Sequence, residues 1–199
     1  MNKSRTYIPK LKGGRVHEVS GDGALAFALL MAFGAMKGRE ALCIGSPDWL
    51  AALQPHGLER FVDPQSLVHV ACPLKTDVLW AAETALRAGA VRVVLLSLFA
   101  TPDGKSLRRL QLAAETGGAL GIILVREVAF TSPAETRWHC QPCRQGDARG
   151  LHVSLYKNKS GVEGSWYLYG YGATEHNTGA GRLAATPAGE PVWPGRLAR

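Results

Sequence analysis

Apolar and polar positions follow one pattern up to about residue 130 and a different pattern after it. In the first part, short and almost wholly apolar runs alternate with stretches in which apolar residues recur every three or four positions. The short runs predict buried strands, and the longer stretches predict helices that cover them. The expected strands are Val16–Val19, Ala41–Gly45, Leu67–Ala71, Val91–Leu98 and Leu120–Val125.

The helices between these strands are marked by their ends as well as by their period. The stretch 24–36 is apolar nearly all round, which predicts a buried helix. The other helices are marked by signals at their ends. A capping residue or a Pro marks where a helix begins, and a Gly marks where it stops. We expect a helix opened by Ser46 and Pro47, a helix Asp77–Ala88 capped by Thr76 and ended by Gly89, and a helix Leu107–Thr116 opened by Asp103 or Ser106.

After residue 130 apolar and polar residues alternate with a period of two, and turn-rich pieces separate the runs. Thr136–Gln141, Leu151–Lys157 and Ser165–Tyr171 therefore predict strands. Because no helical stretch lies between them, these strands should form an antiparallel meander. The whole chain then predicts an α/β three-layer sandwich with a mostly parallel central sheet and a C-terminal antiparallel meander.

Composition fits one globular domain with a real core. The chain has 199 residues, of which 46% are hydrophobic and 20% charged. The longest apolar run, Ala24–Phe33, is too short to cross a bilayer and too far along the chain for a signal peptide. We therefore expect a cytoplasmic protein that does not bind membranes.

The net charge of +7 belongs to the ends of the chain. Residues 1–15 carry five basic residues, among them Lys10 and Lys12, and no acid, and the last eighteen residues carry a smaller excess. We expect residues 1–14 to be a basic flexible arm, 15–172 the core domain, and the Gly-, Ala-, Thr- and Pro-rich residues 173–199 a disordered tail. Basic ends suit an anionic partner such as DNA, although a solubilising arm has the same composition.

The four cysteines do not predict a disulfide framework, because nothing marks the chain as secreted. Cys140 and Cys143 have the spacing of a zinc-binding pair in HCQPC, but no second Cys/His pair completes four ligands. His139 and His152 could in principle join them. The incomplete set predicts no metal.

Residues 15–33, RVHEVSGDGALAFALLMAF, predict a strand, a glycine turn and a helix, which is the frame of a phosphate-binding loop. Such a loop needs a Lys for the phosphates and a hydroxyl for Mg²⁺, and neither follows Gly21, Asp22 and Gly23. The central strand ends in Ser97, where a nucleotide hydrolase of this kind places a carboxylate. We therefore predict a degenerate nucleotide loop, no catalytic residues and no cofactor; another catalytic use of Asp22 or Glu83 is the weaker alternative.

Further cations and aromatic side chains are candidate contacts for DNA phosphate, bases or an acidic partner. Arg108 and Arg109 lie on the polar side of their expected helix, where a merely solvated face is the alternative. Arg137 and Trp138 lie in an expected strand. There, Trp138 could stack on a base or be half-buried.

Several segments together resemble the ImuA family, a RecA-like group that is also related to SulA. The resemblance covers roughly residues 15–172. The SLRRLQLAAE block with a following TRW is the most specific part. The segments are HEVSGDG at 17–23, LWAAETALRAGAVRVVLLS at 79–97, SLRRLQLAAETGGALGIIL at 106–124, TRWHC at 136–140 and LYKNKSGVEGSWYLYGYG at 155–172.

The resemblance implies a RecA-like fold and a non-catalytic, pseudo-ATPase role. Members of the group are taken to be accessory factors in SOS-induced mutagenic translesion DNA synthesis. The implied partners are an ImuB-type Y-family polymerase relative, a RecA filament and an error-prone DNA polymerase, with weak, non-specific DNA binding. Lys157 and Lys159 match a Lys-Asn-Lys that in RecA filaments reaches the neighbouring subunit's phosphates; a charged hairpin shoulder is the alternative. The alternative function is that of a SulA-like cell-division inhibitor that binds FtsZ.

Overall fold

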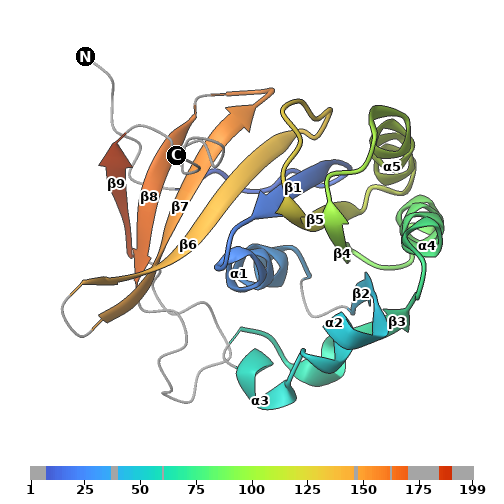
Figure 1. Cartoon of the computed structure of the whole chain (residues 1–199), viewed down its shortest axis with the longest axis horizontal. Helices are drawn as coiled ribbons and strands as arrows, with labels where there is room; N and C mark the ends of the chain where they lie inside the picture. Colours follow the sequence, from blue (N-terminus) through green and yellow to red (C-terminus); the bar gives the residue numbers. More distant parts are fainter. Residues whose placement is uncertain are drawn as a thin grey trace.

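One mixed sheet forms the centre of the molecule (Figure 1). The computed structural model describes residues 8–36, 40–59, 61–145, 148–161, 163–169 and 184–189. Within this part, nine strands follow one another across the sheet in the order β3-β2-β4-β5-β1-β6-β7-β8-β9. The strands are β1 Val16–Ser20, β2 Ala41–Gly45, β3 Leu67–Ala71, β4 Val93–Ala100, β5 Leu120–Glu127, β6 Thr136–Gln145, β7 Ala148–Asn158, β8 Gly164–Tyr169 and β9 Ala184–Gly189.

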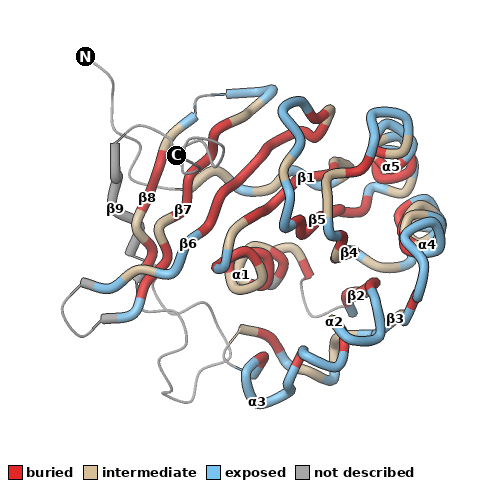
Figure 2. The backbone as a smooth tube through the Cα atoms, viewed as in Figure 1, coloured by how far each residue is buried: buried red, intermediate tan, exposed pale blue. Residues whose placement is uncertain are grey.

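The pairing changes direction where the sequence pattern changes its period. The six strands from β3 to β6 pair in parallel, and β6-β7, β7-β8 and β8-β9 pair antiparallel. A mixed α/β fold with a mostly parallel sheet and antiparallel C-terminal strands is therefore confirmed. The long, nearly apolar β4 lies inside the sheet and is buried along most of its length, as a strand covered on both faces should be (Figure 2).

Helices cover both faces of the parallel part. The helices are α1 Ala24–Met36, α2 Pro47–Ala51, α3 Pro55–Leu58, α4 Lys75–Ala88 and α5 Gly104–Gly117, with a short 3₁₀ turn, η1, at Pro64–Ser66. Helix α1 packs on one face together with α2 and α3, and α4 and α5 pack side by side on the other (Figure 1). In β4 the split is visible residue by residue: Val93 and Leu95 join the first core and Val94 and Leu96 the second. Among the described residues, no helix is both long and apolar enough to span a bilayer.

The helix ends agree with the expected caps except at α4. Ser46 and Asp103 accept hydrogen bonds from the first free backbone N–H groups of α2 and α5, which decides between Asp103 and Ser106. The expectation that Thr76 caps α4 is wrong. The helix begins at Lys75, and the carbonyl of Leu74 accepts from the N–H groups of the first turn without any side-chain cap.

Part of the N-terminal arm is packed on the core. Ile8 and Leu11 lie against the core on the α1 face, and the Gly14 N–H donates to the carbonyl of Ala119 at 3.0 Å. Residues 8–14 of the expected flexible arm thus contact the core, because apolar side chains inside the basic segment find a surface to cover. Lys10 and Lys12 are exposed, and residues 1–7 lie outside the described part.

The C-terminal segment also contributes to the sheet. β9 pairs with β8 from Ser165 opposite Gly189 to Tyr169 opposite Ala184. Residues 184–189 of the segment 173–199, which the sequence predicts to be disordered, form a strand, and the rest of that segment lies outside the described residues. A strand of Ala, Thr, Pro and Gly is held by the backbone ladder of β8 and not by its own propensity.

A buried histidine ties the arm to the sheet. The Nε2 atom of His17 donates to the carbonyl of Lys12 at 3.1 Å, so Nδ1 is the acceptor in the 2.6 Å contact with the Thr136 hydroxyl. Thr136 in turn accepts from the indole N–H of Trp138 at 2.7 Å. This chain of bonds needs a neutral imidazole, and burial lowers the pKa of His17 to about 4.

We expect His17 to make the protein less stable as the pH falls. The unfolded chain takes up the His17 proton near pH 6.5 and the folded chain only near pH 4. The contribution is complete above pH 6.5, is lost progressively down to pH 4, and amounts to about 3 kcal/mol. Urea unfolding between pH 4 and 7.5 measures it. His17→Gln should flatten the slope, and His56→Gln, whose parent side chain is almost fully exposed, should leave it unchanged.

Candidate functional site

The turn between β1 and α1 is closed by the strands beside it. Gly21 has a φ of 90°, and a Cβ atom there would lie 2.3 Å from the carbonyl oxygen of Cys140. The Gly23 N–H donates to the same carbonyl at 3.0 Å, and a Cβ atom at Gly23 would lie 2.5 Å from Leu151. The turn is therefore packed directly against β6 and β7.

The backbone donors of this turn are used inside the protein. The N–H groups of Ala24 and Phe27 donate to the carbonyls of Gly21 and Gly23, both at 3.0 Å. Phe27, at the position where a phosphate loop has polar residues, is fully buried, and its ring centroid lies 4.9 Å from that of Trp138. A phosphate loop works by directing several free N–H groups at one anion. At the predicted degenerate loop, Gly21–Gly23, the N–H of Gly23 instead donates to Cys140 of β6, and those of Ala24 and Phe27 donate to carbonyls of the turn itself.

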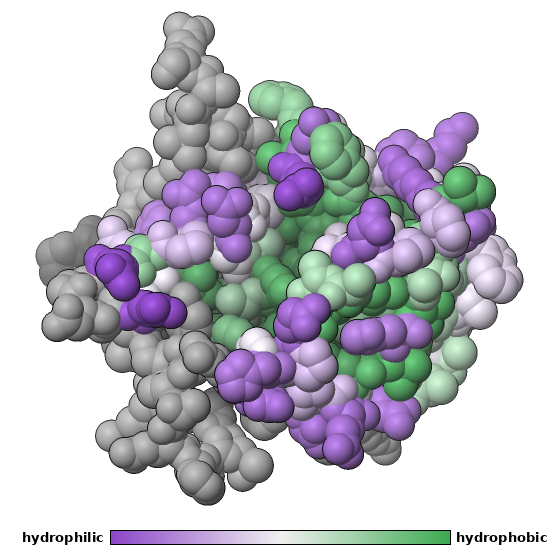
Figure 3. Space-filling view, turned by 60° about the horizontal axis from the view of Figure 1, so that its bottom comes forward, coloured by the Kyte–Doolittle hydropathy of each residue, from purple (hydrophilic) through white to green (hydrophobic). Residues whose placement is uncertain are grey.

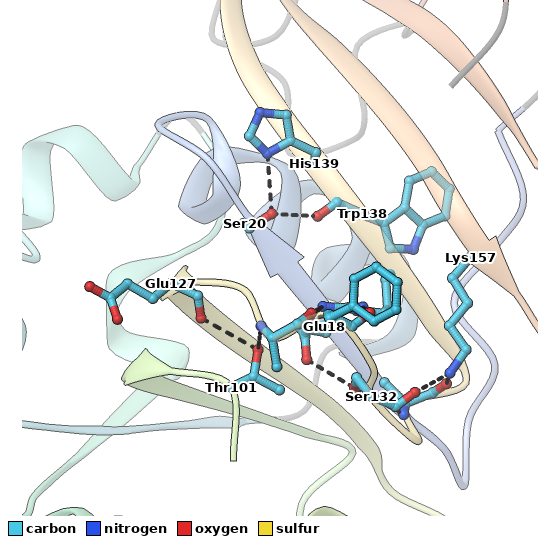
Figure 4. A network of polar contacts seen from close by, with 12 residues as sticks. Glu18, Ser20, Thr101, Glu127, Ser132, Trp138, His139 and Lys157 are labelled. Carbon is cyan, nitrogen blue, oxygen red and sulfur yellow. Dashed lines mark hydrogen bonds and ion pairs between the residues drawn. The ribbon is translucent and has the colours of Figure 1, made fainter. Parts of the chain in front are cut away.

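A polar cluster lies where β1 ends (Figure 4). Ser20 donates to the carbonyl of Trp138 at 3.0 Å and lies 3.2 Å from Nδ1 of His139. Burial lowers the pKa of His139, and the nearby His152 lowers it further, so the imidazole is neutral at pH 7. The Ser20 hydroxyl therefore lies between a backbone carbonyl and an imidazole nitrogen, both within hydrogen-bond distance.

Hydroxyl groups lie in and directly after β4, which ends at Ala100, so the expectation that the central strand ends in Ser97 is wrong. Ser97 is partly buried, and beyond it Thr101 links two loops: its N–H donates to the carbonyl of Glu127 at 3.0 Å, and its hydroxyl accepts from the N–H of Ala129 at 3.1 Å (Figure 4). The nearest acid after this strand along the chain, Asp103, caps α5. Hydrogen bonds from the backbone and hydroxyl of Ser106 lower the pKa of Asp103. This carboxylate is therefore committed to a helix end.

The strongest electrostatic feature is an ion pair inside the protein. Arg137 lies 2.7 Å from the Oε1 atom of Glu18, and both side chains are almost completely buried. The guanidinium lies over the ring of Tyr156, 5.1 Å from its centroid, and burial raises the pKa of that phenol. A buried charge persists only when it is paired and hydrogen-bonded, and here both partners are.

This pair also fixes the segment 128–135 between β5 and β6, which we call the strap. Arg137 donates to the carbonyls of Ala129 and Phe130 at 2.7 and 3.3 Å, and the Ser132 hydroxyl donates to Oε2 of Glu18 at 3.0 Å. The strap therefore lies over the pair and completes its hydrogen bonding. Phe130 is exposed at the surface of the strap.

Lys157 and Lys159 hold the other end of the strap. Lys157 donates to the carbonyls of Ser132 and Ala134, and Lys159 donates to that of Pro133 at 2.6 Å. Burial lowers the pKa of Lys157, and the charges of Lys159 and Arg137 lower it further. The two lysines predicted to contact a neighbour's phosphates thus lie together. Lys159 is exposed, whereas Lys157 is partly buried.

The remaining predicted contact residues are not gathered at one place. Arg108 and Arg109 are exposed on α5, and Arg109 lies 2.7 Å from Glu83 of α4, which Arg87 also contacts. The expectation that Arg137 and Trp138 contact DNA or a partner is corrected by the structure: both are buried. Burial of strand β6 on both faces leaves neither side chain a free surface.

The two cysteines of the CxxC spacing do not point to the same side of the sheet, because they lie on a strand. Cys140 and Cys143 both lie in β6, where residues three apart point to opposite faces. Cys140 is buried in the core, and burial raises its pKa well above the ordinary value. Across the described part of the chain, no group of three or more His, Cys, Asp or Glu side chains is placed to hold a metal ion.

Sequence reasoning did not identify the Glu18–Arg137 pair or the strap. The available signal was Glu18 itself, a charged residue inside the short strand HEV, because a carboxylate there must find a cation once the strand is buried. Which cation it finds depends on the sheet order. No protein-family model matches this chain, and no curated protein matches it significantly.

Proposed function

We propose that this chain is a non-catalytic, RecA-like accessory protein of SOS-induced mutagenic translesion DNA synthesis. It acts in the cytoplasm and connects RecA on DNA with an ImuB-type Y-family polymerase relative and an error-prone DNA polymerase. The proposal is supported by the architecture, a mostly parallel sheet followed by an antiparallel meander. It is also supported by the resemblance of residues 15–172 to the ImuA group.

The closed turn at Gly21–Gly23 is the observation that supports a protein without nucleotide hydrolysis. A nucleotide would need the donors that this turn directs at Cys140 and at its own carbonyls. It would also need the space that Leu151 occupies beside Gly23. A protein with such a turn can retain the outer surfaces of a nucleotide-dependent fold while its own phosphate site is filled by side chains.

The strap refines which lysine reaches a neighbouring phosphate. A lysine ammonium has three N–H donors. Lys157 uses two of them on strap carbonyls and is partly buried, whereas Lys159 donates to Pro133 and is exposed. Lys159 is therefore the residue better placed to bind phosphate of a RecA filament. Exposed Lys10, Lys12 and Arg108 supply weak, salt-dependent attraction to DNA.

Co-purification tests the partners. The tagged chain should retain an ImuB-type polymerase relative and ATP-bound RecA on single-stranded DNA, and should not retain FtsZ. Lys159→Gln should weaken RecA capture about tenfold, since one charge-assisted contact contributes about 1.5–3 kcal/mol. Lys105→Gln, an exposed lysine on α5, serves as the matched control. Calorimetry with Mg-ATP should show no binding at tens of micromolar.

Each readout can reject a different part of the proposal. Capture of FtsZ alone would replace the translesion role by cell-division inhibition. One-to-one micromolar binding of Mg-ATP would show that the turn opens, and the pseudo-ATPase assignment would be dropped. Equal RecA capture by the wild type and by Lys159→Gln would leave Lys159 as a residue that only holds the strap.

A further inference from the structure

The sheet ends on one side in a strand with an unused edge. β3 is the first strand in the sheet order and, among the described residues, pairs only with β2. The Cys72 N–H, directly after β3, donates to Gly45 of β2 at 2.9 Å. Because backbone groups alternate in direction along a strand, the N–H and C=O groups of His69 and Ala71 and the C=O group of Leu67 point away from β2 and are open, whereas the Leu67 N–H donates to the carbonyl of Pro64.

This edge lacks the features that usually keep edge strands from pairing. Natural edge strands carry charged residues, proline or a bulge. The sequence of β3 is LVHVA, and its register with β2 runs without a bulge from Leu67 to Ala71. Val68 is 40% exposed. The edge is thus regular, apolar and open to another strand.

The order of residues in β3 indicates which strand fits. Val68 and Val70 flank His69 symmetrically, so the strand reads almost the same in both directions. We propose that β3 pairs antiparallel with β3 of a second copy of this chain, across a twofold axis at His69. His69 then faces His69 of the partner subunit, and Leu67 faces Ala71 of the partner subunit. The His69 pair exchanges two backbone hydrogen bonds. In the Leu67 pair only the N–H of Ala71 donates, to the carbonyl of Leu67, because the Leu67 N–H already donates to the carbonyl of Pro64 in its own chain.

The side chains complement one another in the same register. Val68 lies opposite Val70 of the partner subunit, in the closer, non-hydrogen-bonded kind of pair, and β-branched residues pack well there. The twofold axis is perpendicular to the sheet, so the α4 helices of both copies flank the seam on one face. Leu74 and Trp80, the exposed apolar side chains at the start of α4, are on that face.

The surface on this side of the molecule carries apolar as well as polar residues. In the space-filling view, apolar patches are exposed between polar side chains over the right-hand half, which carries β2, β3 and α4 in Figure 1 (Figure 3). A second copy of β3 fits this edge because the twofold axis produces two equivalent valine pairs: Val68 of each copy faces Val70 of the partner subunit. A five-residue seam is short, so we expect a weak dimer with a dissociation constant on the order of 10–100 micromolar.

Sedimentation of the full chain across this concentration range tests the dimer. His69→Pro removes the outward N–H at the axis and is tolerated by an edge strand, whose ladder to β2 does not use it. Val68→Lys places a charge opposite Val70 of the partner subunit. Each variant should weaken self-association at least about tenfold. Leu112→Lys replaces an apolar residue on α5 that is more exposed than Val68 and should associate as the wild type does.

Cross-linking tests the register. Directly facing residues of a hydrogen-bonded pair have Cα atoms about 5.5 Å apart, within the range of a disulfide. Under mild oxidation, His69→Cys should therefore give a covalent dimer, and Leu112→Cys should not. A wild type that stays monomeric to about 500 micromolar would overturn the proposal. A dimer that persists in both His69→Pro and Val68→Lys would also overturn it. So would a wild type that is monomeric and uses this edge to bind a different protein, with that binding lost in the two variants.

Discussion

Replacing Arg137 with alanine should lower the free energy of unfolding by about 3–5 kcal/mol, the cost of leaving a buried charge without its partner. Glu18 would keep a fully buried carboxylate whose remaining donor is the Ser132 hydroxyl. The carbonyls of Ala129 and Phe130 would lose the guanidinium that binds them. Urea unfolding of the purified variant measures the loss.

Two further variants test whether the loss comes from the unpaired charge of Glu18 or simply from removing an arginine side chain. Glu18→Gln together with Arg137→Met removes both charges and should recover part of the stability, because no uncompensated charge remains inside. Arg87→Ala breaks the exposed pair with Glu83 and should cost less than about 1 kcal/mol. If Arg137→Ala is no more harmful than Arg87→Ala, the buried pair does not stabilise the fold.

Replacing Trp138 with alanine should cost about 3–5 kcal/mol, as other buried tryptophans do. Its ring is completely buried between α1 and the meander, with centroids 4.9 Å from Phe27 and 6.0 Å from Trp166. The truncation removes the ring that connects α1 with β8 in the core on the α1 face. Trp80→Ala, at a tryptophan that is 68% exposed, should change stability by less than about 0.5 kcal/mol.

The same position also tests the corrected DNA contact. Trp138→Phe keeps most of the apolar volume and should stay folded, although it loses the indole N–H that binds Thr136. Because a buried ring cannot stack on a base, this variant should bind single-stranded DNA as the wild type does. Loss of DNA affinity by a folded Trp138→Phe protein would show that the ring becomes accessible.

The sequence patterns that were confirmed are local. The helix 24–36 and the strands 41–45 and 67–71 begin and end where their apolar runs and turn residues indicated. A buried parallel strand and a Gly-terminated helix are recognised within about ten residues, so no knowledge of the sheet order is needed. The change from parallel to antiparallel pairing was likewise visible as a change of period.

The features that escaped prediction depend on contacts between distant residues. Glu18 and Arg137 are 119 positions apart, and only the placement of β1 beside β6 brings them together. β9 has the composition of a loop and is a strand because β8 offers it a ladder. The strap is fixed by cations from β6 and β7, so its own sequence carries little sign of order.

The central place of β1 has a consequence for how the protein is made. β1 is the first strand in the described part of the chain, yet its two neighbours are β5 and β6. At 5–20 residues per second, a ribosome completes β6 roughly 6–24 s after β1. Throughout that interval β1 and the apolar helix α1 lack strands that bury them. We therefore expect chaperones that bind apolar segments to hold β1 and α1 until β5 and β6 have been made.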